Sequence, residues 1–572
     1  MKSAFACKRV IAIVFSCLLP ALVFVSAQSS GAVAGSALDF WADAEPAGLA
    51  QNITHAMTDE ELLSQILMFG WAGAAPDALL ERWVSERSLG CVKVFGWNTL
   101  NVQQVAASVG FLQRKAAANR FHIPLFVATD QEGGWIRHVK GDTSQTPGNI
   151  AIGASGYPLD AYWSAYYINR EINALGINMN FAPVVDLYTN LESTIIGPRS
   201  FGADPVKCAL LAEAFSKGMS DAGVLATAKH FPGHGDTSLD SHGMLPTITV
   251  DTDTWKQREL VPFKHLIDCG VPAVMSGHLA FPQVTGDDTP ASLSHIFLTD
   301  ILRTQLGFTG LIITDDMMMN GATEYAGALS RAVMLAIEAG NDIVISSSTP
   351  GMNDPLWTVS LERMAKDSAF RSRVRDAACR VVLAKLRYFK QENAAPLFPD
   401  EATVSKRVPD RDGQRFFLEQ ACRSITVLRS GTAFPFHPAK GERVLIAGPF
   451  QSLYAEGQKR YPAASTFYMS YELKSDRSNY DLWNASNLTG VASTFDTIIM
   501  PVYDEHSAKV CQRLRNLGKR VIVFSVMSPV YVLNGFDWAD TILCAYSYSD
   551  FSCAALFAAL NGEIPAEGVL PL

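Results

Sequence analysis

The densest group of reactive side chains in this sequence lies in one short segment. Residues 229–242 (KHFPGHGDTSLDSH) hold three histidines, a lysine and two aspartates. Two glycines and a proline allow the segment to bend sharply. A histidine beside a carboxylate can donate and accept protons near neutral pH, because the carboxylate fixes its tautomer and raises its pKa. The spacing does not match the metal-binding pattern His-Glu-x-x-His and no cysteine assists, so we expect acid–base chemistry and no metal.

Ionisable side chains also occur where apolar runs end. They are Asp130, Asp186, Lys229 with His230, His278, and Asp315 with Asp316. One such residue is equally well explained as a surface charge at a strand end. Several in succession are harder to explain in that way, because the carboxyl ends of the strands of a (β/α)8 barrel meet at one face, which carries the active site.

The elements that must position these residues alternate between short apolar runs and helical stretches. The eight runs are Leu63–Gly70, Cys91–Phe95, Leu125–Thr129, Ile177–Phe181, Val224–Lys229, Ala273–Ser276, Leu311–Thr314 and Asp342–Ile345. This alternation predicts βα units around a parallel sheet. Eight units over roughly 300 residues favour a TIM-type (β/α)8 barrel, with an open, doubly wound sheet as the alternative. Fewer strand candidates follow, and they predict a smaller α/β sandwich domain.

The sequence predicts five segments. Residues 1–27 resemble a secretory signal peptide, since Lys2, Lys8 and Arg9 precede an apolar run. We therefore expect export to a periplasmic or extracellular location, with an uncleaved or lipid-linked membrane anchor, the latter at Cys17, as the alternative. The further segments are a tether (28–57), the catalytic barrel (58–390), a linker (391–440) and the C-terminal α/β sandwich domain (441–572).

The composition excludes some partners. A net charge of −9 over 572 residues gives no reason to expect nucleic acid, which needs a basic face. No Cys-x-x-Cys spacing occurs, so no redox or metal motif is present, and most cysteines are expected to be buried free thiols. Trp71, Trp97 and Trp135 are expected in the core, with stacking on a sugar face as the alternative for each. The sequence does not indicate an oligomeric state.

Several motifs resemble glycoside hydrolase family 3. The segment that begins Lys229-His230-Phe231-Pro232-Gly233-His234-Gly235 is similar to the family signature, and Asp240-Ser241-His242 is similar to that of its β-N-acetylglucosaminidase branch. Further matches are 130–134 (DQEGG), 180–186 (NFAPVVD), 197–201 (GPRSF) and 313–317 (ITDDM). The resemblance covers residues 58–390 in order, and the C-terminal sequence 562–571 resembles the second domain of two-domain members. Where many relatives have arginine, this chain has Trp135.

The resemblance implies a role for each matching residue. Asp315 matches the catalytic nucleophile, His242 the general acid/base and Asp240 its partner. This differs from the usual pair of carboxylates in glycosidases. The residues that match sugar-binding positions are Asp130, Arg199, Lys229 and His230. His278 is also expected to line the site and bind substrate. We expect structural roles for Glu132 and Asp316, and His234 to organise the loop.

Together these features predict a retaining exo-β-N-acetylglucosaminidase without a cofactor. Its substrates would be glycans with terminal β-linked N-acetylglucosamine, such as cell-wall fragments or chito-oligosaccharides. Three alternatives stay open: a β-glucosidase or β-xylosidase of the same family, a β-N-acetylglucosaminide phosphorylase, and a non-catalytic glycan-binding protein. A phosphorylase is compatible with a histidine acid/base, which avoids the charge repulsion between phosphate and a carboxylate.

Overall fold

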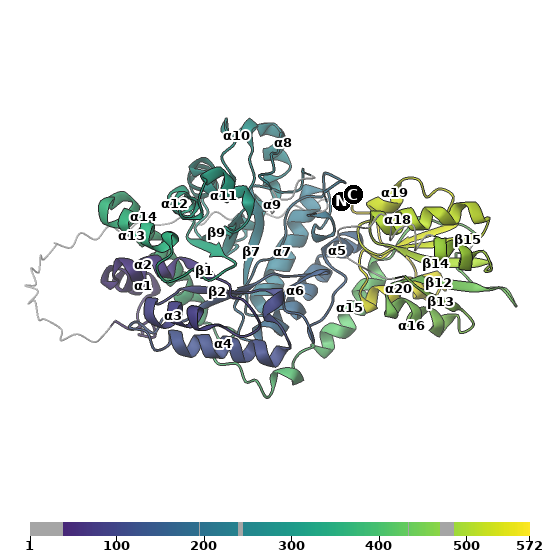
Figure 1. Cartoon of the computed structure of the whole chain (residues 1–572), viewed down its shortest axis with the longest axis horizontal. Coiled ribbons are helices and arrows are strands. Elements are labelled where there is room, and N and C mark those ends of the chain that lie inside the picture. Colours follow the sequence, from purple (N-terminus) through teal and green to yellow (C-terminus); the bar gives the residue numbers. More distant parts are fainter. Residues whose placement is uncertain (1–37, 194, 238–243, 433, 470–485) are drawn as a thin grey trace, which may run out of the picture. The chain divides into compact units, whose positions relative to one another are not determined.

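Eight parallel strands close into a barrel in the first part of the chain, which confirms the predicted fold class (Figure 1). The computed structural model describes residues 38–193, 195–237, 244–432, 434–469 and 486–572. The barrel strands are β1 (Leu67–Phe69), β2 (Cys91–Val94), β3 (Phe126–Thr129), β6 (Met179–Asn180), β7 (Leu225–Phe231), β8 (Ala273–Ser276), β9 (Leu311–Asp316) and β10 (Ile343–Ser346). Every residue of β2, β3, β8 and β10 is buried. Burial on both faces explains why these strands are almost continuously apolar.

Helices surround the barrel strands (Figure 1). Those of eight residues or more are α1 (Pro46–Ala56), α3 (Ala78–Arg87), α4 (Val102–Ala116), α6 (Pro158–Asn173), α7 (Pro205–Asp221), α9 (Leu260–Asp268), η4 (Ile296–Gln305), α12 (Leu329–Ala339), α13 (Pro355–Lys366) and α14 (Ser368–Phe389). Their starts are encoded locally. The Asp204 side chain accepts hydrogen bonds from the first amides of α7, and Asp367 does the same for α14.

The first predicted strand is wrong in its first half. Helix α2 (Asp59–Gln65) occupies the beginning of the run Leu63–Gly70, and β1 starts only at Leu67. A capping box between Thr58 and Glu61 starts this helix. The helix end and the strand are both buried, so one apolar run covers two elements and periodicity cannot separate them.

The second part of the chain is a six-stranded sheet with helices on both faces, as the predicted sandwich requires. Its strands in spatial order are β11 (Thr426–Arg429), β16 (Thr541–Cys544), β15 (Arg520–Ser525), β14 (Thr497–Val502), β12 (Val444–Gly448) and β13 (Ser465–Tyr468). Only β11 is antiparallel to its neighbour. Its helices include α15 (Arg411–Ser424), α16 (Gln451–Arg460), α18 (Glu505–Gln512), α19 (Val530–Leu533) and α20 (Asp550–Leu560).

Two segments expected to be connectors contain regular structure. Helix α1 lies within residues 28–57, and α15 and β11 lie within residues 391–440. Strand β11 pairs with β16, so the sheet recruits chain from before residue 441. The predicted signal peptide lies outside the described residues. Among the residues that are described, no helix is long and apolar enough to cross a bilayer.

The sheet domain and the barrel make direct polar contacts within the compact unit formed by residues 39–572. Arg423 at the end of α15 binds Asp160 of α6 at 2.6 Å. Tyr188 follows β6, and its hydroxyl lies 2.8 Å from the Ser528 hydroxyl. Tyr188 follows the same strand as Asp186, so these contacts support the end of the barrel where the candidate site lies.

Candidate active site

A cavity of about 440 Å³ lies at the carboxyl ends of the barrel strands. Its charged and imidazole-bearing lining residues come from several strands and the loops after them. They are Lys93, Asp130, Glu132, His138, Arg199, Lys229, His230, His234, Asp315 and Asp316. Five residues predicted for the site, namely Asp130, Arg199, Lys229, His230 and Asp315, therefore face one cavity, as the barrel rule requires.

Asp130, directly after β3, is held by two lysines. Its Oδ1 accepts a hydrogen bond from Lys229 Nζ at 2.6 Å, and its Oδ2 lies 2.9 Å from Lys93 Nζ. Burial alone would raise the pKa of Asp130, but Lys229, Lys93 and His138 more than compensate and hold it well below the ordinary value. Asp130 is thus a fixed anion that can accept hydrogen bonds from sugar hydroxyl groups.

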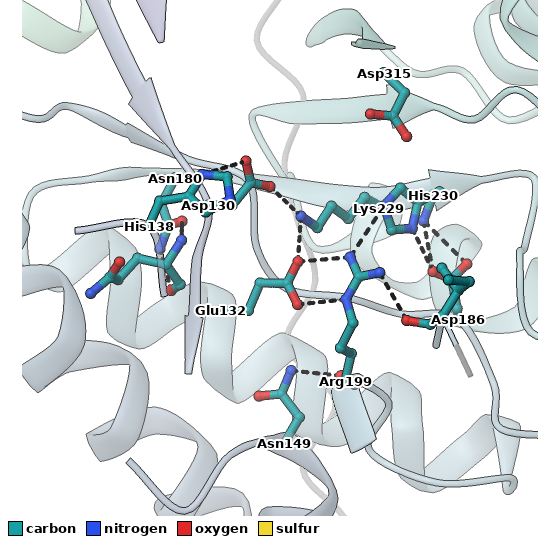
Figure 2. A network of polar contacts seen from close by, with 12 residues as sticks. Asp130, Glu132, His138, Asn149, Asn180, Asp186, Arg199, Lys229, His230 and Asp315 are labelled. Atoms are coloured by element: carbon teal, nitrogen blue, oxygen red, sulfur yellow. Dashed lines mark hydrogen bonds and ion pairs between the residues drawn. The ribbon is translucent and has the colours of Figure 1, made fainter. Parts of the chain in front are cut away.

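Glu132 connects Lys229 to Arg199 (Figure 2). It accepts a bidentate ion pair from Arg199, at 2.9 Å from Nε and 2.8 Å from Nη2, and Lys229 Nζ lies 2.6 Å from its Oε1. Asn149 Nδ2 donates to the Arg199 carbonyl at 2.8 Å, which fixes the backbone of this arginine. Glu132 is buried within these contacts, so the structural role expected for it is the one its geometry supports.

His230 is oriented by a buried carboxylate. Its Nδ1 donates to Asp186 Oδ2 at 2.7 Å, and the His234 amide donates to Asp186 Oδ1 at 2.7 Å. Burial would raise the pKa of Asp186, but His230, His234 and these hydrogen bonds lower it. This partner fixes the tautomer of His230 and leaves Nε2 as an acceptor, which lies 3.5 Å from Arg199 Nη2.

Asp315 occupies the end of β9 and differs from the other carboxylates of the cavity. Among the described residues, only the Asp316 amide donates a hydrogen bond to it, at 2.8 Å. In Figure 2 its carboxylate points toward the network of Lys229 and His230 without joining it. Burial would raise its pKa, but His230, His278 and Lys93 lower the pKa to about 2. Asp315 is therefore ionised at neutral pH and faces the cavity, as a nucleophile must.

Asp316 and His278 support this strand end. Asp316 Oδ1 accepts from the amides of Met318 and Ser347, both at 3.0 Å, as expected for a structural residue. His278 Nε2 donates to the Asp316 carbonyl at 3.0 Å, and its Nδ1 accepts from Ser292 at 2.7 Å. Because both nitrogens are engaged and His278 is not among the residues that line the cavity, the geometry fits a positioning residue rather than the sugar contact predicted for it.

The predicted acid/base pair, Asp240 and His242, lies outside the described residues, which resume at residue 244. The described start of the loop, Lys229 to His234, lines the cavity at several positions. The assignment of Asp240 and His242 stays a prediction based on the motif.

Sequence reasoning missed Lys93 and His138 as cavity residues, and it placed Trp97 and Trp135 wrongly. Lys93 was signalled by its type, because it interrupts the apolar strand β2. His138 Nδ1 lies 3.5 Å from Asp130 Oδ2, but burial lowers its pKa to about 4 and leaves it neutral. Trp71 is buried as expected, whereas Trp97 and Trp135 are 55% and 40% exposed.

Three side chains that could ligate a metal lie together elsewhere among the described residues. Glu213 on α7, with His265 and Cys269 at the end of α9, brings three potential ligand atoms within 4.8 Å of one another. None of these residues lines the cavity that contains Asp315.

The cavity defines a class of enzyme. Fixed carboxylates and cations can hold sugar hydroxyl groups, and an ionised carboxylate on the same cavity can attack an anomeric carbon. A (β/α)8 barrel with this set fits a glycoside hydrolase. The chain belongs to glycosyl hydrolase family 3, since residues 57–383 match the profile described as the family 3 N-terminal domain.

Within this family, the chain is similar to β-hexosaminidases and to a solved β-N-acetylglucosaminidase structure. The chain is 35% identical over 279 residues to a β-hexosaminidase of Thiobacillus denitrificans, which covers 48% of this chain and 75% of that protein. The match to β-hexosaminidase A of Pseudoalteromonas piscicida, also 35% identical, covers 46% of this chain and only 47% of that protein. Among solved structures, a family 3 β-N-acetylglucosaminidase from Paenibacillus sp. is 28% identical with a TM-score of 0.80, over 90% of this chain and 99% of that one. A β-glucoside phosphorylase, 20% identical with a TM-score of 0.77 over 93% of this chain and 97% of that one, shares the fold.

Proposed function

We propose that this protein is an exported, retaining exo-β-N-acetylglucosaminidase that removes terminal β-linked N-acetylglucosamine from glycans. The observation that carries the proposal is Asp315, an ionised carboxylate with a single protein hydrogen bond among the described residues, on a cavity lined by fixed sugar-binding groups. The β-hexosaminidase relatives and the Paenibacillus β-N-acetylglucosaminidase support the choice of sugar.

In the first step, a carboxylate oxygen of Asp315 attacks the anomeric carbon of the terminal sugar. The bond from that carbon to the glycosidic oxygen breaks, and its electrons stay on the oxygen, which takes a proton from His242 as it leaves. The product is a covalent glycosyl-enzyme with inverted configuration. Asp130, Lys229 and Arg199 hold the hydroxyl and acetamido groups, so the anomeric carbon is aligned with Asp315.

In the second step, water replaces the leaving group. His242, now neutral, accepts a proton from the water while the oxygen attacks the anomeric carbon and the bond to Asp315 breaks. A second inversion restores the β configuration. Asp240 keeps the imidazole in the required tautomer and raises its pKa, so that the first step finds it protonated near neutral pH. Neither step uses a metal or an organic cofactor.

The test is a panel of p-nitrophenyl β-glycosides with the purified mature chain, with and without inorganic phosphate. The expected result is release of p-nitrophenol from the N-acetylglucosaminide only, at a rate independent of phosphate, with β-N-acetylglucosamine as the first product seen by NMR. Phosphate-dependent release of a sugar phosphate would identify the phosphorylase instead. Hydrolysis of the glucoside or xyloside would identify the other branch, and binding without turnover a glycan-binding protein.

Export and the natural substrate form a separate part of the proposal. The apolar run after Lys8 and Arg9 supports processing of residues 1–27, which lets the enzyme meet cell-wall fragments or chito-oligosaccharides outside the cytoplasm. Cell fractionation with an antibody against the mature chain tests this part. A product that keeps its N-terminus and stays in the cytoplasm would contradict it.

A further inference from the structure

Trp97 is a large aromatic side chain at the edge of the active-site cavity. It lies in η1 (Gly96–Asn98), directly after β2, and it lines the cavity with 55% of its surface exposed. Asp130 and Lys229, which line the same cavity, are buried. The open indole face is apolar area at the cavity, and a ligand that covers it would gain free energy by removing it from water.

The indole is held rigidly. Its ring stacks on Phe95 with a centroid distance of 4.4 Å and an interplanar angle of 4°. Its Nε1 donates to the Trp71 carbonyl at 2.9 Å, and Asn98 Nδ2 donates to the same carbonyl at 2.9 Å. A ligand that binds this side chain therefore pays little conformational entropy to order it.

Lys93, Phe95 and Trp97 form one wall of the cavity, at alternate positions along the chain. Their exposure rises from 5% at Lys93 through 6% at Phe95 to 55% at Trp97. Lys93 binds Asp130 among the buried polar groups that suit the terminal sugar. Trp97 thus lies at the open end of the wall, beyond the groups that hold the terminal ring.

We propose that Trp97 is the platform of a second sugar subsite, on which the ring that leaves with the glycosidic oxygen stacks. The C–H face of a pyranose is apolar and flat enough to cover an indole ring, whereas its hydroxyl groups stay in water at the cavity mouth. The inference rests on the proposed function and deepens it, because it makes an oligosaccharide of at least two rings the preferred substrate class.

The experiment compares two donors that share the same terminal sugar. N,N′-diacetylchitobiose has a second ring to stack, whereas β-N-acetylglucosaminyl fluoride has a leaving group of one atom. We expect Trp97→Ala to lower kcat/KM for chitobiose roughly tenfold, the scale of one aromatic contact, and to leave kcat/KM for the fluoride unchanged. Trp97→Phe should recover most of the chitobiose activity, because it keeps an aromatic face.

Two controls keep the result specific. Trp135→Ala removes another exposed tryptophan, 40% exposed and not among the cavity-lining residues, and should leave both substrates unaffected. Trp97→Leu keeps apolar cover on Phe95 without an aromatic face, so it should repeat the selective loss even if the alanine variant folds poorly.

Equal losses on chitobiose and fluoride would overturn the inference, because Trp97 would then serve the terminal ring or the fold. An unchanged kcat/KM for chitobiose in both the alanine and the leucine variants would also overturn it. A wild-type enzyme that cleaves neither donor would instead overturn the proposed function, on which the inference rests.

Discussion

Two aspartates at opposite ends of neighbouring barrel strands show how the same side chain serves structure or chemistry. Asp342, directly before β10, is completely buried and accepts hydrogen bonds from Arg303, from Arg373 at 3.0 Å and from the Ile312 amide at 3.0 Å. Asp315, at the end of β9, accepts a hydrogen bond only from the Asp316 amide among the described residues. A saturated carboxylate has no capacity left for a substrate, whereas the Asp315 carboxylate has oxygens open to the cavity, as the proposed nucleophile requires.

The two ends of the barrel also differ in their cavities. A cavity of about 330 Å³ lies at the amino ends of the strands. Segments 270–273 and 307–311 line it together with Arg380 and Arg387, and no carboxylate is among the described residues that line it. The cavity with Asp315 instead collects buried carboxylates and cations from several strands. Size therefore does not distinguish the active end, and the arrangement of charge does.

Exchange of the two aspartates for asparagine tests this contrast most strongly. We expect Asp315→Asn to lower kcat by about 10⁴-fold or more, because no covalent intermediate can form. Its melting temperature should shift less than that of Asp342→Asn. Chromogenic assays and thermal melts of both variants measure these effects, and substantial activity of Asp315→Asn would remove the nucleophile assignment.

Asp342→Asn should affect stability instead. Loss of this charge leaves Arg303 and Arg373 without their buried partner, a change that typically costs ~3–5 kcal/mol of unfolding free energy. At temperatures low enough for Asp342→Asn to stay folded, its kcat should be near the wild-type value. Urea unfolding and initial rates at the same temperature test both parts, and a stable but inactive Asp342→Asn would blur the distinction between the two ends.

Two buried lysines extend the comparison to cations. Lys93 binds Asp130 at the cavity, so Lys93→Met should lower kcat/KM by about 10–100-fold, the usual scale of a charge-assisted hydrogen bond. The effect should appear mainly in KM, because Lys229 still holds Asp130. A raised KM in steady-state kinetics, together with a stability equal to that of the wild type, would agree with this role. A drop in kcat alone would instead place Lys93 in the chemical step.

Substitution of Lys385 is expected to have the smallest effect of those proposed. Lys385 lies at the amino ends of the barrel strands and should affect stability alone. It donates to Gln65 Oε1 at 3.0 Å and to the Gly90 carbonyl at 2.8 Å, and burial lowers its pKa to about 8. Above pH 8 the folded protein releases this proton, while the unfolded chain keeps it until about pH 10.4. The unfolding free energy should therefore rise with pH in this window relative to Lys385→Met. Urea unfolding at pH 7.5 and 9.5 tests this, and parallel changes in the two proteins would contradict it.

The barrel and most of its cavity residues could be predicted because the residues that end an apolar run in the sequence lie at the carboxyl ends of the barrel strands, where the cavity is. Asp130, Lys229, His230 and Asp315 each follow or end an apolar run, and parallel strands bring such positions to one face. The first strand was misplaced because helix α2 and β1 share one apolar run.

The rest of the site depends on contacts that periodicity does not encode. Lys93 lies inside a strand, so its pairing with Asp130 needs the barrel closed before it is visible. His278 was expected at the sugar, but its two ring nitrogens are used by Ser292 and Asp316. Trp97 was expected in the core and is exposed. The expectation failed because the sequence does not reveal which aromatic side chains the fold leaves open to solvent.

Trapping of the covalent intermediate tests the central role of Asp315 most directly. A fluorinated N-acetylglucosaminyl fluoride that reacts quickly but hydrolyses slowly should label the enzyme once. Mass spectrometry of the digested protein should then find the sugar on the carboxylate of Asp315, and none on the Asp315→Asn variant. A label on any other residue, or turnover without a covalent adduct and with an α-anomer as first product, would contradict the account.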